Sequence, residues 1–234
     1  MMLTRFVVVA LVLVAVAFSG CGDRQETATA PSGTAASAIV TPPPLPPPGS
    51  PITFSTVCAA CHGIRGEGNR ELRTPSIAGL PAWYVVEQFG KFRSNVRGTN
   101  PADLDGQRMH AIARLLDETQ ISTLASTVAA MERHPTRNTL GGDGTRGRET
   151  FDERCMPCHR YNGGGELAFK AAPLTGLQDW YLVAQLQKFR TGIRGGALTD
   201  EEGTKMHLVA SDLTDTEFRD VAAYIAQLAE RYRD

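Results

Sequence analysis

The pattern of hydrophobic and polar residues divides the chain into three parts. Residues 6–18 form an unbroken apolar run, with Arg5 just before it. Residues 22–50 are rich in Ala, Ser, Thr and Pro, a composition that does not build a packed core. Helical spacing of apolar residues begins after residue 51 and is clearest at 83–93, 117–132 and 215–232. This third part has no alternating pattern of useful strand length, so the sequence predicts an all-α fold.

The third part is an internal repeat with an offset of 97 residues and no gap. A period near 100 residues is too long for a solenoid unit and fits a small domain present twice. We therefore predict two domains, at 51–138 and 139–234. The matched pairs include Phe54 with Phe151, Gly68 with Gly165, Trp83 with Trp180, Lys91 with Lys188, and Met109 with Met206.

Each repeat contains a Cys-x-x-Cys-His motif, at residues 58–62 and 155–159. This spacing is the attachment signature of c-type haem, in which two thiols bind the haem vinyl groups and the imidazole binds the iron. Disulfides would leave the His after each Cys pair unexplained, and a zinc site would have to gather cysteines from two distant repeats. We predict two covalently bound haem c groups. Their protein partners are the thiols of Cys58, Cys61, Cys155 and Cys158 and the proximal ligands His62 and His159.

Met109 and Met206 are the predicted sixth ligands of the two irons. Each lies 47 residues after its proximal His, and no other Met pair matches between the repeats. A thioether is a soft ligand, and Met/His ligation raises the reduction potential of haem iron. The adjacent His110 and His207 also repeat, so ligation by two histidines is the alternative.

These motifs, in this order, resemble those of class I cytochrome c domains, and the tandem resembles the dihaem cytochrome c4 group. The resemblance covers residues 51–234. It rests on the haem motif, the loop at 74–80, the helix that starts at Trp83, and Met109. It implies two tandem class I cytochrome c domains in a pseudo-twofold pair, joined by the short segment 133–148.

The resemblance also implies that the carbonyl of Pro75 accepts the hydrogen bond of the proximal imidazole in the first domain. In the second domain the offset of 97 falls on Ala172, with Pro173 one position later. The partner of His159 is therefore left open, and such partners tune the basicity of the ligand.

Arginines and tryptophans that repeat near the haem motifs are candidates for the haem environment. Arginine pairs well with carboxylates, and haem propionates are carboxylates that need such partners. A solvent-facing helix end is the alternative role for these arginines. The candidate residues are Arg93, Arg97, Arg190, Arg194, Trp83 and Trp180.

Residues 1–20 have the features of a lipoprotein-type signal peptide. The apolar run is too short to span a membrane. The tripeptide that ends at Cys21 resembles a bacterial lipobox, and Cys21 is the one cysteine outside the haem motifs. We predict a lipid anchor at Cys21 and a Pro-rich linker within 21–50, on the periplasmic side of a bacterial membrane. Ordinary cleavage, for example after Ala17, would instead leave a free thiol and a soluble periplasmic protein.

Charge differs between the repeats, at +2 for residues 51–138 and −3 for residues 139–234. This difference either steers a redox partner or reflects drift in surface charge. No basic run or aromatic-rich platform indicates nucleic-acid binding.

Two six-coordinate haems leave no open position for a substrate, so the predicted function is electron transfer and not catalysis. The expected partners are a redox protein donor and acceptor, with no small-molecule substrate. Electrons would pass from a quinol-oxidising complex to a terminal oxidase or reductase. A dihaem enzyme of the peroxidase or thiosulfate-dehydrogenase type is one alternative and would need a displaceable ligand on one haem. A fixed cytochrome subunit of a respiratory complex is the other.

Overall fold

Helices form the regular structure of residues 51–232, the part of the chain that the computed structural model describes. Within this part there is no strand, and only two isolated bridges occur, Asn69 with Thr74 and Glu166 with Ala171. The all-α prediction is confirmed. The predicted signal peptide, Cys21 and the Pro-rich linker lie outside the described residues.

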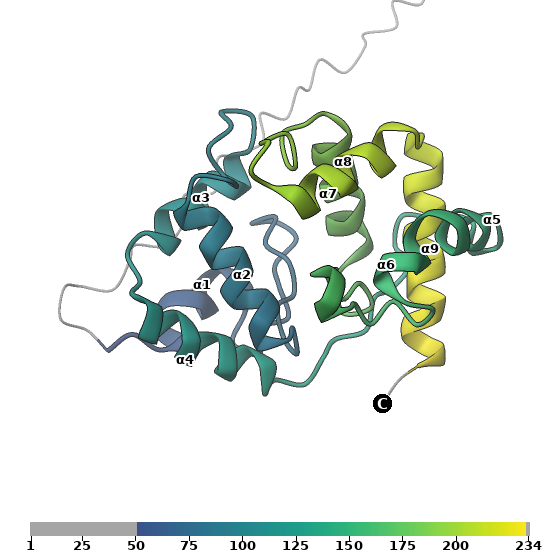
Figure 1. The fold of residues 1–234 in the computed structure, drawn as a ribbon. Coiled ribbons are helices and arrows are strands. Elements are labelled where there is room, and N and C mark those ends of the chain that lie inside the picture. The colour runs from purple at the N-terminus through teal and green to yellow at the C-terminus, as the bar shows by residue number, and fades with distance from the viewer. Residues whose placement is uncertain (1–50, 233–234) are drawn as a thin grey trace, which may run out of the picture. The chain divides into compact units, whose positions relative to one another are not determined.

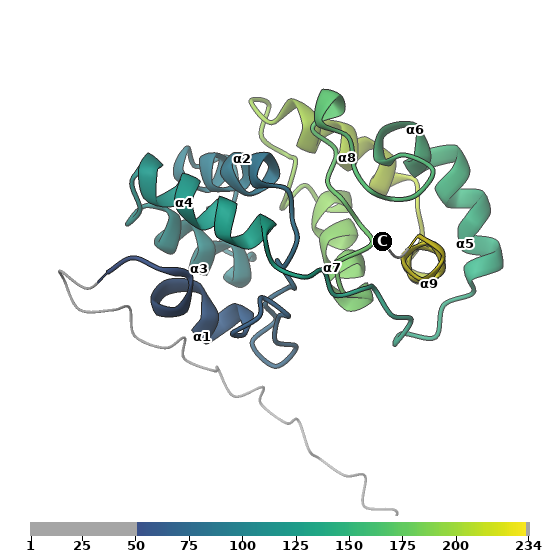
Figure 2. The same cartoon turned by 90° about the horizontal axis from the view of Figure 1, so that it is seen from below.

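The helices of the two repeats follow one another in the same order (Figures 1 and 2). The first repeat consists of η1 (Phe54–Cys58), α1 (Ala59–His62), α2 (Ala82–Arg93), α3 (Leu104–Ala113) and α4 (Glu118–Ala129). The second repeat consists of α5 (Gly144–Thr150), η2 (Phe151–Cys155), α6 (Met156–His159), η3 (Leu167–Phe169), α7 (Asp179–Arg190), α8 (Glu201–Ser211) and α9 (Asp215–Arg231).

The three helices predicted from hydrophobic spacing correspond to α2, α4 and α9. Capping boxes start two of them, because the side chains of Asp117 and Thr214 accept backbone hydrogen bonds three residues later. Helix α7 was expected only as the repeat of the helix that starts at Trp83. The pattern did not predict α3, α8 or α5. These three helices are short, and each buries only two residues, so their apolar faces are too narrow to stand out.

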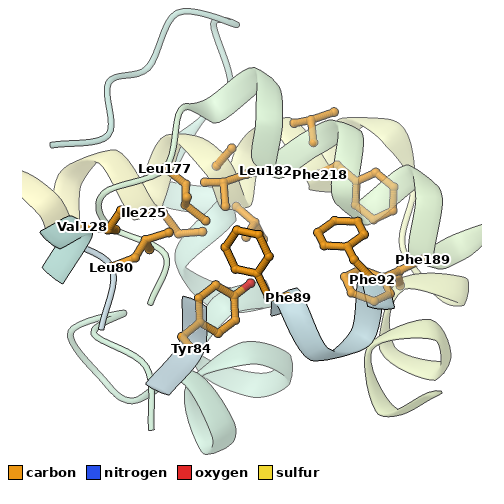
Figure 3. Packing of buried hydrophobic residues seen from close by; sticks show 14 of the residues in the cluster. Leu80, Tyr84, Phe89, Phe92, Val128, Leu177, Leu182, Phe189, Phe218 and Ile225 are labelled. Carbon is orange, nitrogen blue, oxygen red and sulfur yellow. The ribbon is translucent and has the colours of Figure 1, made fainter. Parts of the chain in front are cut away.

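Buried apolar side chains of both repeats belong to one cluster, part of which Figure 3 shows. In the second repeat Phe151 and Phe218 are completely buried. The Phe151 ring meets Tyr224 of α9 edge-on, with centroids 5.3 Å apart. Each fully buried Phe contributes about 1.5–3 kcal/mol to stability. No helix among residues 51–232 is long and apolar enough to cross a membrane.

A buried carboxylate helps to fix the segment between the repeats to the second repeat. Asp179, at the start of α7, is 1% exposed. It accepts hydrogen bonds from the backbone N–H of Thr139 at 2.5 Å, of Leu140 at 2.9 Å and of Trp180 at 2.7 Å, and from the Thr139 hydroxyl at 2.8 Å. The matching residue of the first repeat is Ala82, so this attachment exists once.

We expect Asp179→Ala to lower the free energy of unfolding by about 3 kcal/mol, because it leaves several buried donors without an acceptor. Chemical denaturation of the haem-loaded protein measures this change. Asp212→Ala is the matched control, since that side chain is 68% exposed and lies 3.8 Å from Arg154. It should change stability by less than about 0.5 kcal/mol. Equal effects of the two substitutions would contradict this role of Asp179.

Candidate haem-binding sites

Each Cys-x-x-Cys-His motif lies where a π-helical turn passes directly into a short α-helix. Cys58 ends η1, and Cys61 and His62 follow in α1. Cys155, Cys158 and His159 hold the same places in η2 and α6. None of these four cysteines forms a disulfide, and no three His, Cys, Asp or Glu side chains of residues 51–232 gather as a metal-ion site would require. The described part of the chain therefore contains no arrangement of side chains that supports the disulfide or the zinc alternative.

The surroundings of the first thiol in each motif suit an uncharged thioether. Burial raises the pKa of Cys58 to about 11 and that of Cys155 to about 12, with a smaller contribution from the second cysteine of each motif. Both sulfurs pack against the apolar cluster. An environment that disfavours the thiolate disfavours zinc binding and disulfide exchange. A thioether carries no charge and fits it.

The two motif histidines have equivalent backbone partners. His62 Nδ1 lies 2.8 Å from the carbonyl oxygen of Pro75, and His159 Nδ1 lies 2.7 Å from that of Ala172. A carbonyl only accepts, so each Nδ1 carries the proton and each Nε2 keeps its lone pair for a metal. Burial lowers the pKa of both imidazoles, although the carbonyl acts in the opposite direction. The partner of His159 is thus Ala172, the residue at the offset of 97, and not Pro173.

Glycines let these carbonyl loops approach the motif closely. Gly68 has φ +83°, and a Cβ there would lie 2.6 Å from the carbonyl carbon of Pro75. Gly165 has φ +79°, and a Cβ there would lie 2.8 Å from the carbonyl carbon of Ala172. Residues with a side chain rarely adopt this conformation. Both repeats therefore need glycine where the loop passes the proximal histidine.

Met109 and Met206 lie on α3 and α8 and pack against the apolar cluster. The adjacent histidines make a different contact. His110 Nδ1 donates to the carbonyl of Phe92, and His207 Nδ1 donates to the carbonyl of Phe189, both at 2.6 Å. These carbonyls belong to the last turns of α2 and α7, where helix carbonyls lack intrahelical partners. Each histidine therefore connects two helices of its own repeat.

Arg97 and Arg194 form a polar layer between the repeats together with two glutamines and a tyrosine. We call this set the arginine layer: Arg97, Arg194, Gln88, Gln185 and Tyr181. Arg97 donates to Gln88 at 2.6 Å, to Gln185 at 3.3 Å and to Tyr181 at 3.1 Å. Arg194 donates to Gln185 at 2.9 Å and to Gln88 at 3.1 Å. Each glutamine oxygen therefore accepts hydrogen bonds from both arginines.

The arginine layer has an excess of positive charge. Within residues 51–232 neither Arg97 nor Arg194 contacts a carboxylate, and the buried Nε of Arg97 has no hydrogen-bond partner. Burial disfavours ionisation of Tyr181, yet the two guanidinium groups outweigh this and lower its pKa. Buried charge requires a counter-charge. Haem propionates are carboxylates that fit this requirement.

The other predicted haem-environment residues lie elsewhere. Arg93 is exposed. Arg190 pairs with Asp215 at 2.6 Å and stacks on the Phe218 ring at 4.8 Å. Trp83 and Trp180 are partly buried and pack edge-on against the tyrosines that follow them. The structure therefore brings together one arginine of each repeat and leaves the other apart.

Several residues of these sites were not identified from the sequence. Gln88 and Gln185 join the arginine layer, and Asp103 and Asp200 cap the Met-bearing helices. Both pairs of positions agree with the offset of 97, and so do Gly106 and Gly203. A complete comparison of the two repeats would have found them, because polar matches are harder to explain by packing than apolar ones.

Comparison with known proteins agrees with this geometry. A family model for cytochrome c matches residues 48–129 and again residues 144–229. Cytochrome c-552 of Acidithiobacillus ferridurans is 28% identical over 189 residues, which cover 76% of each chain. A thiosulfate dehydrogenase electron acceptor of Stutzerimonas stutzeri (strain A1501) is 30% identical over 185 residues, which cover 74% of this chain and 80% of that protein.

A solved structure has a similar fold. Cytochrome c4 of Acidithiobacillus ferrooxidans superposes with a TM-score of 0.60 and 26% sequence identity, over 74% of this chain and 99% of that one. The motif, the helices and the family match each occur twice. The chain therefore belongs to the cytochrome c family, as a cytochrome c4-like electron carrier with two domains and two covalently bound haem c groups.

Proposed function

We propose that this dihaem cytochrome carries electrons from a quinol-oxidising complex to a terminal oxidase or reductase, and that it is not an enzyme. The observation that supports this most directly is the equivalence of the two sites. Each has a proximal histidine held by a carbonyl and a methionine on a short helix packed against the core. An enzyme needs one haem with an open or displaceable position, and neither site is specialised in this way.

In this proposal His62 and His159 are the proximal ligands, and Met109 and Met206 are the sixth ligands. The tautomer fixed by Pro75 and Ala172 leaves Nε2 free for iron in both domains. The Nδ1 contacts of His110 and His207 with helix carbonyls leave their Nε2 atoms with a lone pair, so these two histidines stay the alternative sixth ligands. Haem supplies one-electron chemistry at the iron, and the protein supplies ligands and electrostatics.

The arginine layer is proposed to hold haem propionates through Arg97 and Arg194. Its positive charge favours electron gain at both haems and lies between the repeats. Arg93 and Arg190 then act at the surface, where Arg190 already has a carboxylate partner in Asp215. A relative named as a thiosulfate dehydrogenase electron acceptor supports a carrier role for this kind of protein.

Carriage on the periplasmic side of a bacterial membrane, through a lipid at Cys21, completes the proposal. It rests on the signal-peptide pattern and on the one cysteine outside the haem motifs. Haem attachment to Cys-x-x-Cys-His outside the bacterial cytoplasm agrees with export. A fixed subunit of a respiratory complex would share the anchor, and it would co-purify with that complex after mild detergent extraction.

Methionine ligation at both haems predicts a closed coordination sphere. The ferric protein should show the weak red band of sulfur-to-iron charge transfer, and Met109→Ala or Met206→Ala should each remove about half of it. The ferrous wild type should bind no carbon monoxide, whereas each variant should bind one equivalent per protein. Optical titration measures both. His110→Ala and His207→Ala are the controls and should keep the band. Carbon monoxide binding by the wild type would argue for an enzyme.

Crowding the loop that carries the carbonyl partner of a proximal histidine should shift the reduction potential of that haem. Gly68→Ala should push the Pro75 carbonyl away from His62. A weaker hydrogen bond makes the imidazole a poorer donor to ferric iron, so the potential of the first haem should rise by tens of millivolts, where about 59 mV is a factor of ten. Gly165→Ala should raise the other potential alone. Potentiometric titration resolves the two.

Gly90→Ala is the control for those two substitutions, since a Cβ at Gly90 meets nothing within 4 Å. It lies inside α2 and should leave both potentials unchanged, while adding about 0.5–1 kcal/mol of stability. If Gly68→Ala and Gly165→Ala shift the same haem, the assignment of the carbonyls is wrong.

The anchor predicts a change of localisation on removing one sulfur. Wild-type protein should sediment with membranes and enter detergent, and Cys21→Ser should block lipid transfer. The multiple acyl chains of a lipoprotein matter, because one chain binds only marginally. Intact mass of the mature protein measures the modification. An unmodified mature chain that begins before Cys21 would show ordinary cleavage instead.

A further inference from the structure

Two lysines form ion pairs that cross between the repeats in a reciprocal way. Lys91 of α2 lies 2.7 Å from Asp200 and 3.2 Å from Glu202 of the second repeat. Lys188 of α7 lies 2.5 Å from Asp103 and 3.3 Å from Asp105 of the first repeat. Each distance joins the lysine Nζ to a carboxylate oxygen. Lys91 and Lys188 are matched residues, so one contact occurs twice with the repeats exchanged.

The carboxylates at the centre of these pairs begin the helices that carry the methionines. The side chain of Asp103 accepts from the N–H of Gly106 at 3.0 Å and caps α3. Asp200 accepts from Gly203 at 3.1 Å and caps α8. A Cβ on either glycine would lie about 2 Å from the aspartate oxygen (2.1 Å at Gly106 and 2.0 Å at Gly203), so only glycine fits beneath the cap.

These ion pairs are shielded from water. The side chains of Asp103 and Asp200 are each 3% exposed, and those of Lys188 and Lys91 are 12% and 17% exposed. Burial is the largest single influence and tends to raise the pKa of Asp103, but the hydrogen bond and charge of Lys188, with the N–H of Gly106 and the charge of Arg97, together lower it. Removing one partner of such a pair leaves a buried charge without compensation.

We propose that each lysine is a positioning residue for the axial methionine of the other repeat. Lys188 fixes the cap of α3 and thereby the placement of Met109, while Lys91 fixes the cap of α8 and the placement of Met206. Each methionine lies six positions after its cap, less than two helical turns, so the start of the helix sets where the sulfur lies. This inference rests on the proposed methionine ligation.

The consequence is a coupling between the two haem sites that is carried by the polypeptide and not by the haem groups. A change at α7 of the second repeat would alter how Met109 binds the iron of the first repeat. A change at α2 of the first repeat would alter how Met206 binds the iron of the second. Coupling between two sites is a free energy shared by both. The lysine contacts provide a physical route for it, from one domain into the ligand helix of the next.

The test uses the red charge-transfer band in a protein where one methionine reports alone. In a Met206→His background the second haem has no sulfur ligand, so the remaining band comes from Met109. Imidazole is titrated into the ferric holoprotein, and its midpoint for loss of the band measures how firmly Met109 is held. Lys188→Leu should lower that midpoint about fivefold or more, and Lys91→Leu should leave it unchanged.

The mirror experiment exchanges the roles. In a Met109→His background, Lys91→Leu should lower the midpoint and Lys188→Leu should not. Lys91→Arg should keep most of the midpoint in this background, and Lys188→Arg should do so in the Met206→His background, because arginine keeps the charge. Arg148→Gln, at a side chain that is 65% exposed, controls for loss of one positive charge. A general loosening of the domain contact would move both haems together and would overturn the proposal, as would an effect of each lysine on its own repeat.

Asp103→Asn provides a second route if Lys188→Leu fails to fold. The amide keeps an oxygen to accept from Gly106 but loses the charge that Lys188 needs. In the Met206→His background it should lower the imidazole midpoint for loss of the Met109 band, and an unchanged midpoint would overturn the proposal. Absence of the band already in the Met206→His protein would refute Met109 ligation itself, and the inference with it. A normal band without the crossed pattern would refute the inference alone.

Discussion

The contact between the repeats contains two partly buried guanidinium groups. Its stability depends on negative charge that balances them. Arg97 and Arg194 stack on Phe92 and Phe189, at 4.6 and 4.5 Å from the ring centroids, and share the oxygens of two glutamines. Neutral oxygens satisfy some of their N–H groups but do not balance their charge. In the proposed function the propionates of the haem groups supply the missing negative charge. Because a domain of about 90 residues has a poor ratio of core to surface, the same groups also supply apolar volume that the chain lacks.

The sequence predicted the features that depend on local order. The haem motif and the helix caps are short local patterns, and the offset of 97 is the distance at which such patterns recur. The structure has α2, α4 and α9 where hydrophobic spacing predicted helices. The sequence left the partner of His159 open, because the residue that matches Pro75 is Ala172 and the proline of this loop, Pro173, comes one position later. A backbone carbonyl makes the contact, and its position depends on chain length between motif and loop, which the repeat preserves.

The lysine pairs were beyond sequence reasoning for a different reason. In a repeated sequence Lys91 is related in the same way to Asp103 and to Asp200, and spacing cannot distinguish a contact within a repeat from one between repeats. Only the packing of α2 against the second repeat decides this. Differences between the repeats are equally hard to anticipate. Gln178, which replaces Pro81, reaches back to the N–H of Ser76 and the carbonyl of Glu67, so the second repeat supports the first without a counterpart.

The carbonyl of Ala172 has a consequence for how such domains are found and altered. Any residue except one that distorts the loop offers the same oxygen at that place, so proline is a stiffener of the loop and not the source of the hydrogen bond. A search pattern that demands proline there would pass over the second domain of this protein. An engineer could also vary the residue at 172 to change loop stiffness while leaving the histidine tautomer fixed, which separates two properties that a proline combines.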